Sequence, residues 1–238
     1  MFSLVVPTYN ERFNIGPLIG RIEGALKQKP FDFEIIVVDD NSPDETWRRA
    51  QEMAREDSHL RVIRREGSRG LATAVVEGWK AAKGEILGVM DADMQHPPEL
   101  LPDLLDPILM GRADIVIGSR HVSGGSVGKW NLPRRSVSRG ASAIAFMMLP
   151  QILRPVRDPM SGFFLVKRVV IDLALLRPTG YKILLEILAK GKYRRVVEVP
   201  YVFEERKNGK SKLGPKHYLE FILHLGMLAT KARVHSHP

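Results

Sequence analysis

Short apolar runs alternate with helix-like segments over the first 119 residues, and this alternation constrains the fold more than any other feature of the chain. The apolar runs, at 2–6, 33–38, 60–63, 86–90 and 114–118, have the length and branched-residue content of strands. The segments between them carry apolar residues at helical spacing. Strand and helix in turn, with short connections, predict an α/β domain with a mostly parallel central sheet and helices on both faces.

Three of the expected strands end in polar groups. Thr8-Tyr9-Asn10-Glu11 follows the first, Asp39-Asp40 the second, and Asp91-Ala92-Asp93-Met94-Gln95 the fourth. The carboxyl ends of parallel strands lie along one edge of such a sheet, where ligands gather. We therefore expect a binding crevice built from these segments.

The Asp91–Gln95 segment has two interpretations. In extended backbone Asp91 and Asp93 point to the same side, and Gln95 adds a neutral oxygen at the next alternate position. Such an oxygen set suits Mg²⁺ or Mn²⁺. Alternatively, the segment is an Asp-rich turn that caps a helix opened by Pro97 and Pro98. The motif alone does not decide between them.

Helix starts can also be predicted locally. Asn10 or Asn14 is a candidate cap for the first helix. For the second helix, Ser42 is the expected cap and Pro43 the expected first helical residue.

Several classes of protein are excluded. The chain has no cysteine, which rules out a disulfide scaffold and a cysteine-ligated metal. No G-x-G-x-x-G follows the first strand, and Gly209-Lys210-Ser211 is not a P-loop because the required first glycine falls on Glu204. No signal peptide is expected, and no apolar run reaches the roughly 18 residues of a membrane span. A bound nucleotide would thus need a metal rather than a glycine-rich cradle for its diphosphate.

The net charge of +9 hides an asymmetry. Residues 1–119 contain 14 Lys and Arg against 20 Asp and Glu, whereas residues 120–238 contain 22 against 7. A strongly basic half indicates phosphate, nucleic acid or an anionic membrane surface, although a merely solvated basic face fits the same count. Basic stripes interleaved with aromatic residues, typical of nucleic-acid sites, are missing, so no nucleic-acid partner is expected.

The second half predicts helices at 138–153, 181–189 and 217–231, a turn followed by a strand within 158–166, a strand at 194–199, and a mobile charged loop at 204–212. The last helix is strongly apolar with basic flanks, which suits a helix lying at a membrane interface. A core helix packed on the sheet fits its first part equally well.

Taken together, these motifs resemble the family 2 glycosyltransferases with the GT-A fold, and among them the polyprenol (dolichol) phosphate mannose synthases. The matching segments are 6–11, 37–44, 70–74, 90–97, 118–120, 158–163 and 206–214. They occur in the family's order and cover nearly the whole chain. The run 124–130, followed by Arg134, Ser138, Arg139 and Gly140, favours the mannose synthases over other sugar transferases.

The resemblance implies an inverting, metal-dependent transfer of mannose from GDP-mannose to a polyprenyl phosphate. It implies donor contacts by ten residues: Pro7, Tyr9, Glu11, Val37, Asp39, Asp91, Ala92, Asp93, Arg206 and Lys212. It further implies Mg²⁺ or Mn²⁺ on Asp91, Asp93 and Gln95, and the acceptor phosphate on Arg120, Arg134 and Ser138. Asp93, Arg120, Arg206 and Lys212 are the implied catalytic residues, with Arg206 and Lys212 closing over the donor as a lid.

The chemistry agrees with the residue types. A metal stabilises the charge that develops on the leaving GDP. The acceptor phosphate has a second pKa near ~6, so it is already ionised and needs no general base. It needs cations instead, and guanidinium groups match phosphate oxygens well.

We expect a GT-A catalytic domain over 1–215, with a nucleotide-sugar half at 1–119 and an acceptor half at 120–215, and an amphipathic membrane-proximal helix over 216–238. The expected location is the cytoplasmic face of a membrane, with either an anchoring partner subunit or further C-terminal spans. Two alternatives stay open: transfer of another sugar, as from UDP-glucose, and a non-catalytic module that binds anionic lipid.

Overall fold

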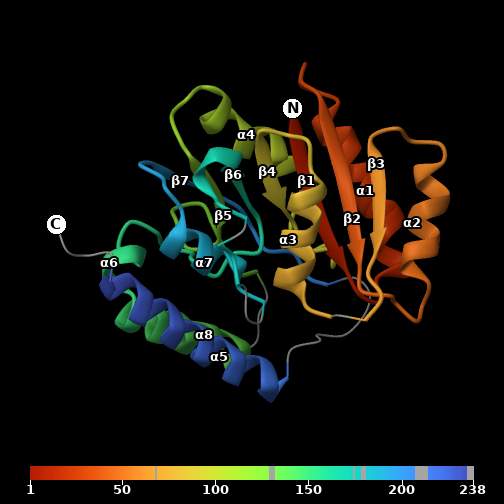
Figure 1. Ribbon diagram of the computed structural model, residues 1–238. Helices are drawn as coiled ribbons and strands as arrows, with labels where there is room; N and C mark the ends of the chain where they lie inside the picture. The colour runs from red at the N-terminus through yellow and green to blue at the C-terminus, as the bar shows by residue number, and fades with distance from the viewer. Residues whose placement is uncertain (68, 129–131, 174, 178–180, 207–213, 235–238) are drawn as a thin grey trace.

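The computed structural model describes residues 1–67, 69–128, 132–173, 175–177, 181–206 and 214–234. A seven-stranded sheet in the order β3-β2-β1-β4-β6-β5-β7 forms the centre of the molecule (Figure 1). The strands are β1 (Phe2–Thr8), β2 (Phe33–Asp39), β3 (Leu60–Arg64), β4 (Ile86–Val89), β5 (Ile115–Ser119), β6 (Phe164–Lys167) and β7 (Val196–Pro200).

All neighbouring strands are parallel except at β6, which runs antiparallel to both β4 and β5. The register aligns Phe2 of β1 with Phe33 of β2 and Ile86 of β4, so the carboxyl ends of these three strands lie along one edge. The predicted mostly parallel sheet is confirmed. Placing β6 between β4 and β5 brings the residues just before β6 to the end of β4.

Helices cover both faces of the sheet. They are α1 (Arg12–Leu26), α2 (Thr46–Ala54), α3 (Leu71–Ala81), α4 (Leu101–Leu109), α5 (Leu132–Met148), α6 (Pro150–Leu153), α7 (Ile183–Lys190) and α8 (Pro215–Val234), with short 3₁₀ turns η1 (Pro98–Leu100) and η2 (Arg168–Val170). Side chains alternate along each strand, so each strand contributes to two cores. One core packs on α1 and α4, and the other on α3, α5, α6, α7 and α8.

Helices α5 and α8 lie side by side as an outer layer, with α7 beside them (Figure 1). The inner face of α8 is buried through Phe221, Leu225 and Leu228. Its outer face exposes large apolar side chains: Leu219, Ile222, Leu223 and Met227. Helix α8 thus combines both interpretations of the sequence, since one face belongs to the core and the other is apolar and uncovered. None of the helices described is both long and apolar enough to cross a membrane.

The predicted helix caps were wrong. Helix α2 begins at Thr46, after Glu45 in a left-handed conformation (φ 62°), and not at Pro43. The backbone N–H and the hydroxyl of Ser42 donate instead to the Asp39 carboxylate, at 2.7 and 2.6 Å. Helix α1 begins at Arg12, and Asn14 lies inside it, donating to the Glu11 carboxylate at 2.6 Å. In both cases the residue predicted to cap the helix, Ser42 or Asn14, donates its hydrogen bond to a buried carboxylate instead.

Candidate active site

The loops after β1 and β2 are tied together at the carboxyl edge by the Asp39 carboxylate. Asp39 is fully buried, and it accepts a hydrogen bond from the Thr8 hydroxyl at 2.7 Å as well as the two from Ser42. The Ser42 hydroxyl in turn accepts from the Asn10 N–H at 2.9 Å. This network satisfies the charge of Asp39 and fixes the shape of the edge at which the donor is predicted to bind.

Other residues predicted to contact the donor lie at or beside this edge, and their donor contacts stay predictions. The Arg69 guanidinium lies 4.8 Å from the centre of the Tyr9 ring, and the Glu11 N–H donates to the Thr46 hydroxyl at 2.9 Å. Pro7 is buried in β1, and the side chain of Val37 lies in the core. A donor contact by Val37 therefore has to come from its backbone.

Left-handed backbone marks three of the strand ends. Asn10, Asn41 and Met94 follow β1, β2 and β4 with φ values of 55°, 52° and 63°. Such conformations are costly for residues other than glycine and are found at functional sites, held by their surroundings. Met94 lies within the Asp91–Gln95 segment, so the two carboxylates sit on a bend rather than on a straight extension of β4.

Asp91 presents an unsatisfied oxygen. Its Oδ1 is buried and accepts no hydrogen bond from the described residues, while its Oδ2 lies 3.4 Å from His96 Nε2. Burial acts to raise the pKa of Asp91, but the hydrogen bond from His96 and the charges of Lys182 and Arg206 hold that pKa below its usual range. An ionised carboxylate with an orphaned oxygen is what a bound cation would satisfy.

Gly162 lies directly against the Asp91 carboxylate. A Cβ added to Gly162 would meet Asp91 Oδ2 at 2.6 Å. Gly162 belongs to the segment that runs into β6, the strand inserted beside β4. The absence of a side chain at 162 therefore leaves the room that the Asp91 carboxylate occupies.

Asp93 is joined to Arg206. Asp93 Oδ1 accepts from the Gln95 N–H at 3.2 Å, and Oδ2 accepts from Arg206 Nη2 at 2.5 Å. Gln95 is buried, its side-chain amide donates to the Glu204 carbonyl at 3.0 Å, and its own carbonyl accepts from the Glu204 N–H at 2.9 Å. The motif is thus bound to the segment after β7 at two points.

His96 is part of the site, although its position before two prolines gave it no role in the sequence. The residue is buried, and its ring packs against Phe163, Tyr201 and Phe203 with centroids 5.3 to 5.5 Å apart. Its Nδ1 lies 2.8 Å from the Tyr201 hydroxyl. Burial raises the pKa of Tyr201, so the phenol keeps its proton. The two ring nitrogens of His96 thus face the Tyr201 hydroxyl on one side and the Asp91 carboxylate on the other.

Arg120 forms a buried bidentate pair with Asp158. Nε and Nη2 donate to the two carboxylate oxygens at 2.7 Å each, and both side chains are less than a tenth exposed. Burial acts to raise the pKa of Asp158, but the hydrogen bonds and charge of Arg120 keep that pKa below its ordinary value. Two of the guanidinium donors predicted to hold a phosphate are therefore engaged by Asp158.

Lys182 also lies at this site and was missed. Its Nζ donates to the Met160 carbonyl at 2.7 Å, in the same segment as Asp158 and Gly162. Burial and the neighbouring Arg120 lower the pKa of Lys182 to about 8, against the charges of Asp91 and Asp158. The sequence gives one local signal only, a lysine before an apolar helix, which is also typical of an ordinary surface residue.

Three further predicted residues lie partly or wholly outside the described part of the chain. Arg134 and Ser138 lie in α5, but their side chains are outside the described part of the chain. Lys212 lies outside the described residues altogether. Ala92 is buried in the core with its neighbour Met94. The structure therefore brings together Asp91, Asp93, Gln95, Arg120 and Arg206 from the predicted set.

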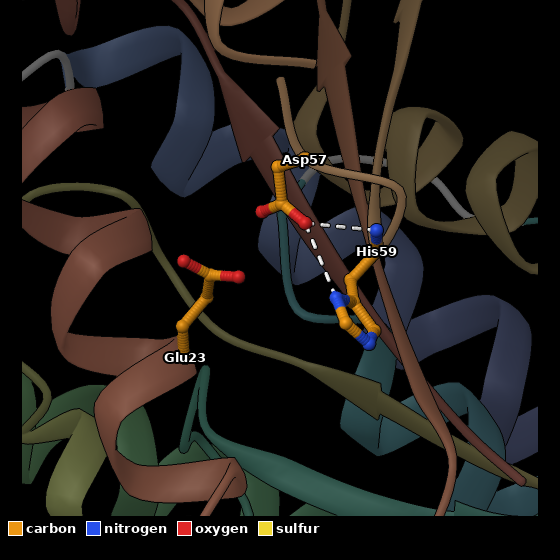
Figure 2. A group of neighbouring side chains, drawn as sticks. All are labelled: Glu23, Asp57 and His59. Carbon is orange, nitrogen blue, oxygen red and sulfur yellow. Dashed lines mark hydrogen bonds and ion pairs between the residues drawn. The ribbon is translucent and has the colours of Figure 1, made fainter. Parts of the chain in front are cut away.

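A second acidic group lies at the opposite edge of the sheet, where β3 begins. Glu23, Asp57 and His59 have potential ligand atoms within 4.8 Å of one another, and Figure 2 shows the three side chains converging. Asp57 Oδ1 already accepts from the backbone N–H of His59 at 2.9 Å and lies 3.2 Å from its ring Nδ1 (Figure 2). Burial and the Asp57 carboxyl raise the pKa of Glu23, and the hydrogen bonds with Glu23 and His59 lower the pKa of Asp57.

Comparison with known proteins identifies the family. Residues 3–173 match the model of glycosyl transferase family 2. The chain belongs to glycosyl transferase family 2. The predicted family and its α/β fold are thereby confirmed.

Relatives within glycosyl transferase family 2 cover most of this chain. It is 48% identical over 223 residues to a dolichol-phosphate mannosyltransferase of Pyrococcus furiosus, a match that covers 94% of this chain and 62% of that protein. It is 36% identical over 234 residues to a dolichol-phosphate mannosyltransferase of Saccharomyces cerevisiae, covering 94% and 85%. The chain thus spans less than two thirds of the length of the Pyrococcus relative.

Among solved structures, glucosyl-3-phosphoglycerate synthase from Mycobacterium tuberculosis, in complex with Mn²⁺, UDP and glucosyl-3-phosphoglycerate, has the same fold. The TM-score is 0.65 at 20% sequence identity, over 98% of this chain and 77% of that one. The match supports the GT-A architecture.

Proposed function

We propose that this family 2 glycosyltransferase moves mannose from GDP-mannose to a polyprenyl (dolichyl) monophosphate, with inversion at the sugar. The observation that carries the proposal is the arrangement at the end of β4, where Asp91, Asp93 and Arg206 meet beside the buried Arg120–Asp158 pair. The arrangement offers a cation site and a set of basic groups in one place, as a transfer between two phosphate-bearing substrates requires. The names of the relatives, dolichol-phosphate mannosyltransferases, support the choice of mannose and of dolichyl phosphate.

The residues present fit a divalent cation. Asp91 contributes an ionised carboxylate with an unpartnered oxygen, and Asp93 a second carboxylate from the same bend. Mg²⁺ or Mn²⁺ held by Asp91 and Asp93, with Gln95 as a further predicted ligand, would neutralise the diphosphate of the donor. A solved structure with this fold contains Mn²⁺ together with UDP.

Arg206 has a role that depends on what Asp93 binds. In the structure its guanidinium donates to the oxygen that a cation at Asp93 would also use. If a cation were bound there, Arg206 would lose this carboxylate oxygen, and its guanidinium could pair with the donor diphosphate, on which negative charge accumulates as the sugar departs. Arg206 would then act on the donor together with Lys212, which we propose to close over it.

The acceptor phosphate needs positioning rather than activation. It carries its own negative charge at neutral pH, with a second pKa of about 6, so its oxygen attacks without a general base. Arg120 lies in the half of the chain that is basic, and Asp158 fixes its orientation. We place the acceptor phosphate near Arg120, with Arg134 and Ser138 of α5 as the further predicted contacts.

The outer face of α8 suits contact with a membrane surface. Leu219 and Leu223 are 62% and 57% exposed and lie one helical turn apart. An apolar face of this kind with basic flanks favours the interface of an anionic membrane such as the cytoplasmic leaflet. We propose that residues 216–238 rest on that surface while 1–119 and 120–215 bind the donor and the acceptor.

The proposal is tested by calorimetry with GDP-mannose and UDP-glucose, with and without Mn²⁺, and by transfer of labelled mannose to a polyprenyl phosphate. GDP-mannose is expected to bind only with Mn²⁺, and Asp93→Asn is expected to abolish that binding. Asp103→Asn, at an exposed position in α4, is the matched control. A preference for UDP-glucose would move the activity to another sugar, and no binding of either donor would favour a non-catalytic module that binds anionic lipid.

A further inference from the structure

Lys182 is a charged side chain at the candidate site that no part of the predicted mechanism uses. It precedes α7, and its ammonium is held by the Met160 carbonyl at 2.7 Å and lies 5.0 Å from the centre of the Tyr181 ring. Tyr181 adds a cation–π contact that keeps the ammonium in place. These two contacts fix the position of the Lys182 ammonium.

The ammonium has more donors than the structure uses. An ammonium has three N–H groups, and the described residues accept one of them, at Met160. Asp91 and Asp158 are near enough to act on its charge, but neither forms an ion pair with it among the described residues. A partly buried cation without a direct counter-ion is costly, and an anionic ligand would offset that cost.

Lys182 reaches the site from a different segment of the chain than Arg206 does. Arg206 reaches the carboxylate pair from the segment after β7 and pairs with Asp93, whereas Lys182 comes from the segment before α7. The Met160 contact ties Lys182 to the segment 158–162, which carries Asp158 at one end and lies against Asp91 at the other. The ammonium of Lys182 is therefore near enough to both Asp91 and the Arg120–Asp158 pair to feel their charges.

We propose that Lys182 binds an oxygen of the acceptor phosphate and holds that phosphate beside the cation site during transfer. Asp158 engages Nε and Nη2 of Arg120, and the ammonium of Lys182 adds further cationic donors beside that guanidinium. This assignment rests on the proposed function, that is, on transfer to a monophosphate acceptor.

Lys182 acts by position and charge only. In the transfer, an acceptor phosphate oxygen forms a bond to the anomeric carbon while the bond from that carbon to the donor diphosphate breaks, and the electron pair leaves with the nucleoside diphosphate. No proton moves to or from Lys182. Its ammonium orients the attacking phosphate and lowers the repulsion between two anionic substrates.

The test uses Lys182→Met, which keeps most of the length of the side chain and removes its charge. The kinetic constants are measured separately for a polyprenyl monophosphate in detergent and for GDP-mannose with Mn²⁺. We expect kcat/KM for the acceptor to fall by about tenfold or more, as for loss of a charged hydrogen bond, while the Kd of GDP with Mn²⁺ stays within about twofold. Lys182→Arg should recover most of the acceptor activity, and Lys192→Met, at an exposed position past α7, should change neither constant.

A second measurement separates recognition of the phosphate from recognition of the lipid tail. Wild-type protein should bind a polyprenyl phosphate more tightly than the matching polyprenol, and Lys182→Met should lose most of that preference. Unchanged acceptor kcat/KM in a folded Lys182→Met variant would overturn the proposal, and so would a loss confined to GDP-mannose binding. If Lys182→Met does not fold, Lys182→Gln takes its place with the same criteria. Absence of mannose transfer by the wild-type protein would instead refute the proposed function.

Discussion

Gly162→Ala tests whether the position of the Asp91 carboxylate matters for metal-dependent chemistry. The new Cβ would lie 2.6 Å from Asp91 Oδ2 and 3.1 Å from its carboxyl carbon. Real Cβ contacts are essentially never shorter than 3.0 Å and become ordinary at 3.4 Å, so the carboxylate has to shift by about 0.4 to 0.8 Å. The backbone of Gly162 has no positive φ, so alanine adds crowding without backbone strain.

A shift of this size is small for a fold and large for a cation site. Mg²⁺ requires near-octahedral geometry with metal–oxygen distances of about 2.0–2.1 Å, and working sites tolerate displacements of roughly 0.5 Å. Displacements near 1 Å can cost on the order of 100-fold in rate. We therefore expect Gly162→Ala to lower kcat by about 10- to 100-fold and to raise the Mn²⁺ concentration that gives half-maximal activity.

Stability should change little. Replacing glycine by alanine at a permitted conformation contributes about 0.4–1 kcal/mol through the unfolded chain, which offsets part of the cost of the local shift. The assay compares mannose transfer at increasing Mn²⁺ with thermal unfolding of the same samples. Gly20→Ala is the matched control, because a Cβ there meets nothing within 4 Å. Unchanged turnover and unchanged Mn²⁺ dependence in Gly162→Ala would refute the argument, since the carboxylate could then move without consequence.

Three further predictions concern stability, the cation and the outer helix. The hydrogen bond with Lys167 is the main reason that the pKa of Asp114 is lowered to about 2, so its contribution to stability is present above the unfolded pKa of 3.8 and is lost as the pH falls through about 2. In urea titrations, Asp114→Asn should lower the free energy of unfolding by about 1–2 kcal/mol at pH 7 and make its decline below pH 4 less steep. The same decline in the variant as in the wild type would contradict the assignment. Removal of divalent ions by EDTA should abolish GDP binding reversibly in wild-type protein, with Mn²⁺ restoring it; binding that persists in EDTA would exclude the cation from donor recognition. The double variant Leu219→Gln and Leu223→Gln should bind anionic vesicles at least about tenfold more weakly without a lower melting temperature, because both side chains are exposed, and equal vesicle binding would remove α8 from the membrane contact.

The local pattern of the sequence was sufficient for the strands and for the edge at which they end. Apolar runs such as 33–38 specify buried strands because the period and the branching of the side chains fit a sheet covered on both faces. Polar residues that follow several such runs must meet at one edge, so the sequence assigns Asp39, Asp91 and Asp93 to one crevice. The ordered motifs then identified the family.

Local rules failed where a buried carboxylate competed for the same group. Ser42 is a good helix cap in isolation, but Asp39, fully buried at the end of β2, has to be satisfied and takes both its hydroxyl and its N–H. Helix α2 accordingly begins later than its sequence predicts.

Contacts between distant segments were decided only by the tertiary structure. Insertion of β6 antiparallel between β4 and β5 brings Gly162 against Asp91, and the segment before α7 brings Lys182 to the same place. No periodicity links these positions, because each lies in a segment whose own pattern is complete without the other. The sequence by itself determined that two carboxylates stand at the end of β4. The packing of the chain around them decided that Asp91 Oδ1 is left without a hydrogen-bond partner among the described residues and that Lys182 and Arg206 lie near Asp91, because those contacts come from segments distant in sequence.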